Sequence, residues 1–131
     1  MTILVDTDWV VDYLKAKKAA VDLLDSLVPE GLAISLITYG EIYEGVYYGQ
    51  NPRQHEQGFL DFLRGVDVLA INRPIMAEFA RIRGELRARG QLIGDLDLLI
   101  AATALHHGLP LLTNNGRHFR RISQLTLYTA P

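Results

Sequence analysis

The chain has 131 residues, enough for a single domain with one sizeable hydrophobic core. Thirteen Lys and Arg residues stand against fifteen Asp and Glu residues, and the net charge of -2 excludes a general attraction to nucleic acid or membrane. The absence of cysteine excludes disulfides, thiolate metal sites and a cysteine nucleophile. No secretory signal and no run of 18 uncharged apolar residues is present, so we expect a soluble, cytoplasmic protein without a membrane segment.

Short apolar runs alternate with helical spacing along the whole chain. In chain order, the pattern predicts a strand at 3–6, helices at 8–16 and 19–27, a strand at 32–35, helices at 36–48 and 54–64, a strand at 66–71, helices at 74–89 and 95–107, and strands at 109–113 and 125–128. Strands separated by helices predict an α/β fold, with a parallel sheet flanked by helices on both faces. No repeat or linker interrupts the pattern, so we expect a single domain over residues 1–131.

Acidic residues lie at three of the expected element boundaries. Asp6 ends the first strand, Glu41 shares one side of the helix at 36–48 with Ser35 and Thr38, and Asp97 lies in the first turn of the helix at 95–107. Helix capping, the helix dipole or a solvated helix face could explain each helical acid separately. Asp6 differs, because a carboxylate that ends a buried strand is costly unless something binds it.

These acids could meet, because ligands of parallel sheets collect at the carboxyl ends of the strands. Together, Asp6, Glu41 and Asp97 would raise one another's pKa unless a cation were present. An all-oxygen set suits Mg²⁺ or Mn²⁺, and such an ion can activate water and orient a phosphodiester. The sequence therefore suggests a divalent-metal site.

A second chemistry is suggested by the opening DTDWV, which resembles the first motif of haloacid-dehalogenase-type phosphatases. Those enzymes need a strand-end hydroxyl, then a lysine, then a late acidic pair. Here Thr113 follows the acidic pair at 95–97, and the three lysines lie within residues 15–18. The order disfavours a phosphatase, which we keep as the less favoured alternative.

Three segments in this order resemble PIN-domain nucleases, and specifically the VapC-type toxins of toxin–antitoxin pairs: VDTDWVVDYL, SLITYGEIYEG and GQLIGDLDLLIAATALHHGLPLLTNNGRHFRRI. The resemblance covers essentially the whole chain. It implies a metal-dependent endoribonuclease whose catalytic and metal-binding acids are Asp6, Glu41 and Asp97, with Mg²⁺ as cofactor and Mn²⁺ as a substitute. It further implies supporting roles for the possible ligands Asp95 and Asn115 and for the polar residues Thr7, Ser35 and Thr38.

The chain departs from the family pattern at two places. Asp8 stands where many relatives carry Asn or Ser, and we expect it to cap the first helix or to add charge near the ion. Many relatives have a fourth acid in the segment that reads TNNGRHF here, where Asn114, Asn115 and His118 remain. That puts a second metal in doubt. The asparagines could simply form a turn, and His118 is interpreted as a surface or packing residue.

RNA is the substrate that the resemblance implies, so positive charge must come from nearby side chains. Arginines cluster in the stretch RIRGELRARG at 81–90 and at positions 117, 120 and 121. From these two clusters we predict RNA contacts by Arg83, Arg87 and Arg117. A helix that alternates Arg with Glu can also be merely solvated. The resemblance also implies a homodimer and a VapB-like antitoxin that sets an Arg or Lys against the acids. A stripe of tyrosines at 39, 43 and 47 is interpreted as core or interface.

Two other functions stay open at this point. One is a housekeeping PIN-domain nuclease for RNA processing, and the other is a binding module that kept the fold but lost catalysis through the missing fourth acid.

Overall fold

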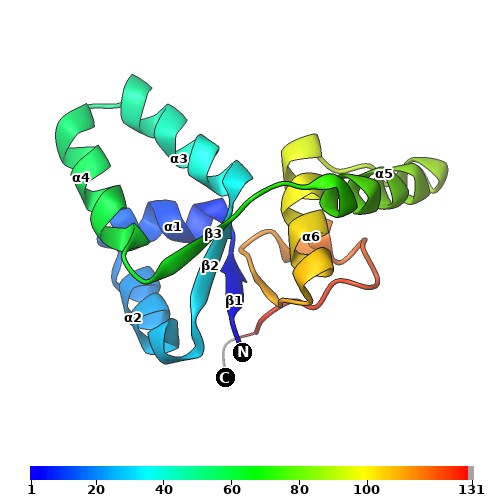
Figure 1. The fold of residues 1–131 in the computed structure, drawn as a ribbon, viewed down its shortest axis with the longest axis horizontal. Helices are drawn as coiled ribbons and strands as arrows, with labels where there is room; N and C mark the ends of the chain where they lie inside the picture. Colours follow the sequence, from blue (N-terminus) through cyan, green and yellow to red (C-terminus); the bar gives the residue numbers. More distant parts are fainter. Residues whose placement is uncertain (130–131) are drawn as a thin grey trace.

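The computed structural model describes residues 1–129 as a four-stranded parallel sheet with helices packed on both faces (Figure 1). In chain order the elements are β1 (Ile3–Val5), α1 (Thr7–Leu14), α2 (Lys18–Leu27), the short 3-10 helix η1 (Val28–Glu30), β2 (Leu32–Ser35), α3 (Leu36–Tyr48), α4 (Pro52–Leu63), β3 (Val66–Leu69), α5 (Arg73–Ala88), α6 (Asp95–His107), β4 (Leu111–Leu112) and α7 (Gly116–Phe119). The predicted α/β class, with helices flanking a parallel sheet, is confirmed.

The strands lie in the order β3-β2-β1-β4. The chain moves outward from β1 to β2 and β3, and then returns to place β4 on the other side of β1. Leu4 of β1 is paired with Ala33 of β2 and with Leu111 of β4. The strand order therefore reverses between β1 and β4, and such a switch point is where open parallel sheets bind ligands.

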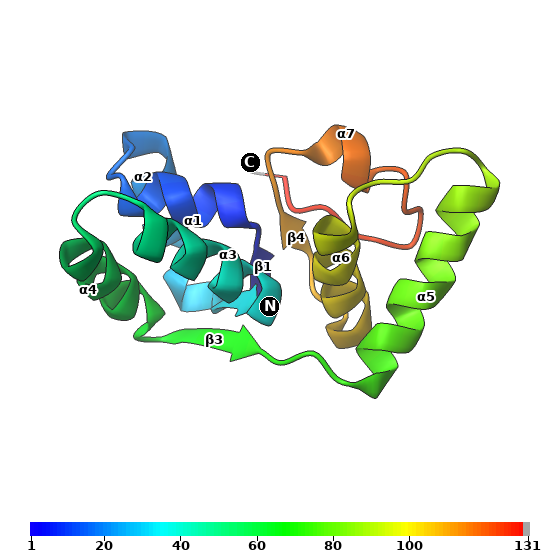
Figure 2. The same cartoon turned by 90° about the horizontal axis from the view of Figure 1, so that it is seen from above.

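Alternation along each strand divides the core into two layers. Leu4, Ala33 and Leu111 pack in the cluster that includes residues of α5, α6 and α7, whereas Val5 and Ile34 pack with residues of α1 to α4. Figure 2 shows α1 to α4 on one side of β1 and α5, α6 and α7 on the other. The sheet is thus buried on both faces, which leaves its edges and strand ends for chemistry.

Caps at the helix starts fix where the functional side chains lie. Asp6 caps α1 by accepting a hydrogen bond from the Thr7 N–H, and Ser35 caps α3 by accepting one from the Thr38 N–H. Of the two alternatives for Asp8, the helix cap is excluded because Asp6 takes that position, whereas Asp8 does add negative charge that acts on Asp6 and Asp97. At the carboxyl end of α6, Gly108 has a φ of 64° and ends that helix in the left-handed conformation.

The tyrosine stripe of α3 is partly core and partly surface. Tyr39 and Tyr43 each lie 5.7 Å from the ring of Phe59, measured between ring centroids, and the Tyr43 hydroxyl donates to Glu56 at 2.8 Å. Tyr47, by contrast, is 68% exposed. The interpretation as core is therefore confirmed for the first two rings.

The last part of the chain differs from the expected strands. The strand predicted at 109–113 is reduced to β4, Leu111–Leu112, and Pro110, just before it, has no N–H to pair. The strand predicted at 125–128 is reduced to one parallel bridge between Leu111 and Leu127. The segment interpreted as a turn at Asn114 and Asn115 leads into α7.

No helix among residues 1–129 combines the length and the apolar composition needed to cross a bilayer.

Candidate active site

Asp6 lies at the switch point, directly after β1, and is only 5% exposed. Its Oδ1 accepts a hydrogen bond from the Thr7 N–H at 2.8 Å, and its Oδ2 accepts one from the Thr113 hydroxyl at 2.6 Å. Thr113 follows β4, and the Asp6 N–H donates to the Leu112 carbonyl in the same sheet at 2.9 Å. Asp6 is therefore held across the point where the strand order reverses.

A chain of hydroxyl groups connects the starts of α1 and α3 to Glu41. The Thr7 hydroxyl donates to Glu41 Oε1 at 2.7 Å and lies 3.0 Å from the Thr38 hydroxyl. A hydroxyl has one proton, so Thr38 must donate to Thr7, and Ser35, at 3.5 Å from the Thr38 hydroxyl, then donates to Thr38. All three protons point along the chain toward the Glu41 carboxylate, which they hold in place.

Ser35 and Thr38 are fully buried, whereas Thr7 is half-buried. The buried pair therefore supports Glu41 through hydrogen bonds and does not present its hydroxyls on the protein surface.

Asp97 is half-buried in the first turn of α6. Burial raises the pKa of its carboxyl, and the negative charges of Asp6, Glu41 and Asp8 raise it further, while His118 acts in the opposite direction. These influences place the carboxyls of three separate elements within electrostatic reach of one another. Figure 1 shows the corresponding arrangement, in which α1 and α3 begin next to the end of β1 and α6 lies alongside.

The pKa of Asp6 is also raised, and burial is again the main cause. Its hydrogen bonds from Thr113 and Thr7 lower the pKa, while the charge of Asp8 raises it. The Asp6 carboxyl therefore lies in a buried environment that disfavours its charged form, and the hydrogen bonds from Thr113 and Thr7 offset only part of that free-energy cost.

Within residues 1–129, no Lys or Arg forms an ion pair with Asp6, Glu41 or Asp97. In the same part of the chain, no three acidic or histidine side chains are arranged to hold one metal ion as they stand. The oxygen donors and their uncompensated charge fit Mg²⁺ or Mn²⁺. Joint ligation of one ion therefore requires the side chains to rearrange.

The sequence model of the PIN domain matches residues 3–125. The chain belongs to the PIN-domain family. Ribonuclease VapC1 of Methanocaldococcus jannaschii is 36% identical over 125 residues, which are 95% of this chain and 84% of that protein. A tRNA(fMet)-specific endonuclease VapC of Shigella flexneri is 30% identical over 122 residues, which are 93% and 92% of the two chains.

Among solved structures, the crystal structure of VapBC2 from Rickettsia felis, bound to a DNA fragment from their promoter, superposes with a TM-score of 0.92 at 28% identity. The superposition covers 100% of both chains.

Two predicted residues of this PIN domain contact each other and lie outside the acidic cluster. Arg83 Nε donates to Asp95 Oδ1 at 2.9 Å, and the Asp95 side chain is 61% exposed. Asp95 is also absent from the charges that raise the pKa of Asp97. The structure thus pairs Asp95 with Arg83.

The segment after β4 contributes a residue that the sequence analysis considered only for a phosphatase. Thr113 contacts Asp6, and its hydroxyl also accepts the Asn115 N–H at 2.9 Å. The sequence showed only that Thr113 ends an apolar run; the pairing of β4 with β1, which brings Thr113 to Asp6, is a property of the fold. Asn115 Nδ2 lies 3.0 Å from His118 Nδ1, so His118 belongs to the rim of this site and was not recognised as such.

Two predicted RNA contacts lie on the surface. Arg87 near the end of α5 and Arg117 in α7 are both exposed. Among the described residues, neither makes a hydrogen bond through its side chain or an ion pair, in contrast to Arg83.

Proposed function

We propose that this PIN domain is an Mg²⁺- or Mn²⁺-dependent endoribonuclease, the toxin of a VapBC-type toxin–antitoxin pair, and that it hydrolyses RNA phosphodiester bonds. The observation that carries the proposal is geometric: Asp6 is buried at the switch point, and Thr7 binds both acids, Asp6 through its N–H and Glu41 through its hydroxyl. The pKa of Asp97, raised by burial and then by the charges of Asp6 and Glu41, supports the inclusion of the third acid. The relatives named as ribonucleases give the class of substrate.

In this mechanism Asp6, Glu41 and Asp97 would hold the divalent cation, with Asn115 as a supporting ligand. The bound ion supplies Lewis-acid chemistry that activates water and neutralises charge on the phosphodiester. Thr113 and the Thr7 N–H orient the two oxygens of Asp6. Neutralisation of the cluster by a cation also removes the repulsion that raises the pKa of Asp97.

Positive side chains must bring an RNA backbone to an acidic site. We assign this role to Arg117 and Arg87, which are exposed, and give Arg83 a smaller share because Asp95 already neutralises it. Arg117 lies on α7 next to His118, whose charge acts on Asp97, so it is the first of the two to test.

A VapB-like antitoxin would inhibit the enzyme by placing a cationic side chain against the three acids, which have no such partner among residues 1–129. The neighbour that superposes on this chain comes from a VapBC assembly, which supports a partner of this kind. We further propose that the toxin is a homodimer that acts in the cytoplasm. The absence of cysteine fits a reducing compartment.

The test is cleavage of RNA by the purified protein with Mg²⁺ or Mn²⁺. Total RNA and tRNA(fMet) serve as substrates, and the 5′ ends of the products are mapped. The wild type is compared with Asp97→Asn and with Asp67→Asn, a matched control on the exposed part of β3. We expect cleavage by the wild type and the control and none by Asp97→Asn.

Equal cleavage by all three proteins would indicate a contaminating nuclease and would remove the enzyme assignment. Co-expression with each small gene that adjoins this one, where the genome has one, tests the toxin role. If no neighbouring gene relieves the growth arrest, or if no arrest occurs, the protein is a housekeeping nuclease and not a toxin.

A further inference from the structure

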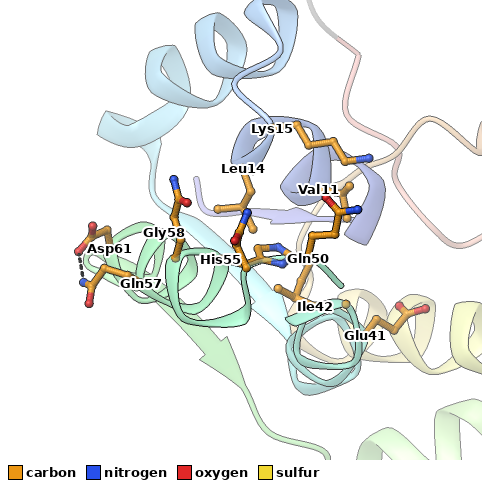
Figure 3. A pocket seen from close by; sticks show the side chains of 13 residues that line it. Val11, Leu14, Lys15, Glu41, Ile42, Gln50, His55, Gln57, Gly58 and Asp61 are labelled. Carbon is orange, nitrogen blue, oxygen red and sulfur yellow. Dashed lines mark hydrogen bonds between the residues drawn. The ribbon is translucent and has the colours of Figure 1, made fainter. Parts of the chain in front are cut away.

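A pocket of about 770 Å³ lies between α1, α3 and α4, beside the acidic cluster. Its volume is within the roughly 300–1,000 Å³ typical of small-molecule sites. Figure 3 shows Glu41 at one end of the pocket and Gln57 and Asp61 at the other. The Glu41 carboxylate is turned toward α6, so this residue forms a wall shared by the pocket and the acidic cluster.

We propose that this pocket binds one nucleobase of a single-stranded RNA, next to the phosphodiester that is cut, and thereby sets the base preference of the enzyme. This inference rests on the proposed ribonuclease function for the position of the RNA. The pocket itself is argued from its lining.

The floor of the pocket is apolar and its rim is rich in carboxamides. Val11, Leu14 and Ile42 supply apolar surface, while Gln50, Asn51, Gln54, Gln57 and His55 supply hydrogen-bond donors and acceptors. A nucleobase has apolar faces and a polar edge, and proteins read the edges of unstacked RNA bases with such side chains.

The charges at the pocket also favour a nucleotide. Lys15 lines it and is exposed at the end of α1, where its amine can reach a phosphate. The acid at the far end, Asp61, is already held by Gln57 Nε2 at 3.1 Å and by Arg64 at 3.6 Å. Glu41, the other acid of the lining, already accepts a hydrogen bond from the Thr7 hydroxyl at 2.7 Å. Lys15 forms no ion pair with any described residue, so it is the most available of the three charges at the pocket.

Two glycines line the pocket and make it open. A Cβ at Gly58 in α4 would meet nothing within 4 Å, and one at Gly45 in α3 would meet only His55 Cε1 at 3.7 Å. Leucine at position 58 would therefore extend into the pocket without disturbing the backbone, and it is a better helix former than glycine. Gly84 in α5 also meets nothing within 4 Å and lies outside the pocket, so Gly84→Leu is the matched control.

The experiment is an NMR titration of the metal-free, full-length protein with each of the four ribonucleoside 5′-monophosphates. Ribose 5-phosphate, which lacks a base, is the control ligand. We expect base-dependent shifts of the backbone amides of Gly45 and Gly58 and of the side-chain amide of Gln50. Gly58→Leu should weaken binding about tenfold or more, and Gly84→Leu should leave it unchanged.

If Gly58→Leu does not fold, Gln50→Ala replaces it, with Gln124→Ala as control; both glutamines are exposed and lie outside helices and strands. For Gln50→Ala we expect a changed ranking of the four bases in the titration. In RNA cleavage, it should also change the base mapped beside the cut.

Three results would overturn the inference: no shift at the pocket, equal shifts with ribose 5-phosphate, or unchanged nucleotide binding in a folded pocket variant. If the purified product of the neighbouring small gene shifts the pocket resonances and no nucleotide does, the pocket is a polypeptide site and the inference is wrong. The titration needs no catalysis. Base-dependent shifts without RNA cleavage would refute the proposed function and leave the base site standing.

Discussion

Replacement of Asp97 by Asn should have opposite effects on stability without and with a divalent cation. Without the ion, Asp97 carries a charge that burial and the neighbouring Asp6 and Glu41 destabilise in the folded state. The amide of Asn keeps the shape and removes that charge. We therefore expect the ion-free variant to melt at a higher temperature than the wild type.

With the ion, the order should reverse. An ion at 100 times its dissociation constant stabilises the folded state by about 2.7 kcal/mol. For a chain of 131 residues the entropy of unfolding is about 275 cal/mol/K, so the wild-type melting temperature should rise by about 10 °C. A hundredfold loss of affinity in the Asp97→Asn variant leaves about 0.4 kcal/mol, or about 1.5 °C.

The assay is differential scanning calorimetry with EDTA and with Mn²⁺ or Mg²⁺ at matched ionic strength. Asp67→Asn is the control for the loss of one negative charge, because Asp67 is exposed and is not among the charges that act on Asp97. This control should follow the wild type under both conditions.

Two results would refute the reasoning separately. An ion-free Asp97→Asn variant that melts below the wild type would show that the three acids do not repel one another. Equal stabilisation of the variant and the wild type by the ion would show that Asp97 is not a ligand.

Thr113→Val should destabilise the protein by about 1–3 kcal/mol in chemical unfolding, because it leaves the buried Asp6 oxygen without its donor, whereas Thr113→Ser should be close to wild type. The pKa values of Asp6 and Asp97 are raised, so the folded state binds more protons than the unfolded chain, and each contribution falls as the pH rises from 3.8 through the raised value. The stability advantage of ion-free Asp97→Asn should therefore disappear below pH 3.8; an advantage that persists there would contradict the assignment to charge. Gly84→Ala should stabilise the protein by about 1 kcal/mol, since its Cβ meets nothing within 4 Å in a helix interior, and Gly108→Ala should destabilise it by about 1–2 kcal/mol, since φ is 64° there. Thermal melts of the two glycine variants that shift in the same direction would contradict this prediction.

Much of the secondary structure could be predicted because periodicity is a local property. The helices expected at 36–48 and 95–107 have the bounds of α3 and α6. The apolar strand before Asp6 and the helix after it could also be predicted from neighbouring residues. The predicted strand at 125–128 was mostly wrong, because a strand depends on a partner edge, and only Leu127 makes a bridge there.

The choice between Asp95 and Asp97 shows what a local pattern leaves open. Both are good first-turn residues of the same helix, but two helical positions differ by roughly 200° around the axis. Asp95 and Asp97 must therefore point to different sides of α6, and only one of them can point toward the other acids. The packing of α6 turned Asp97 toward the other acids and Asp95 toward Arg83.

The sequence by itself determined most helices and strands, the burial of the sheet on both faces and the positions of the acids along the chain, because each depends on residues close together in the chain. The tertiary structure alone decided that Thr113 lies 2.6 Å from Asp6, although 107 positions separate them. The physical reason is the return of the chain to the far side of β1, which places the ends of β1 and β4 next to each other. No periodicity within a single segment encodes that return.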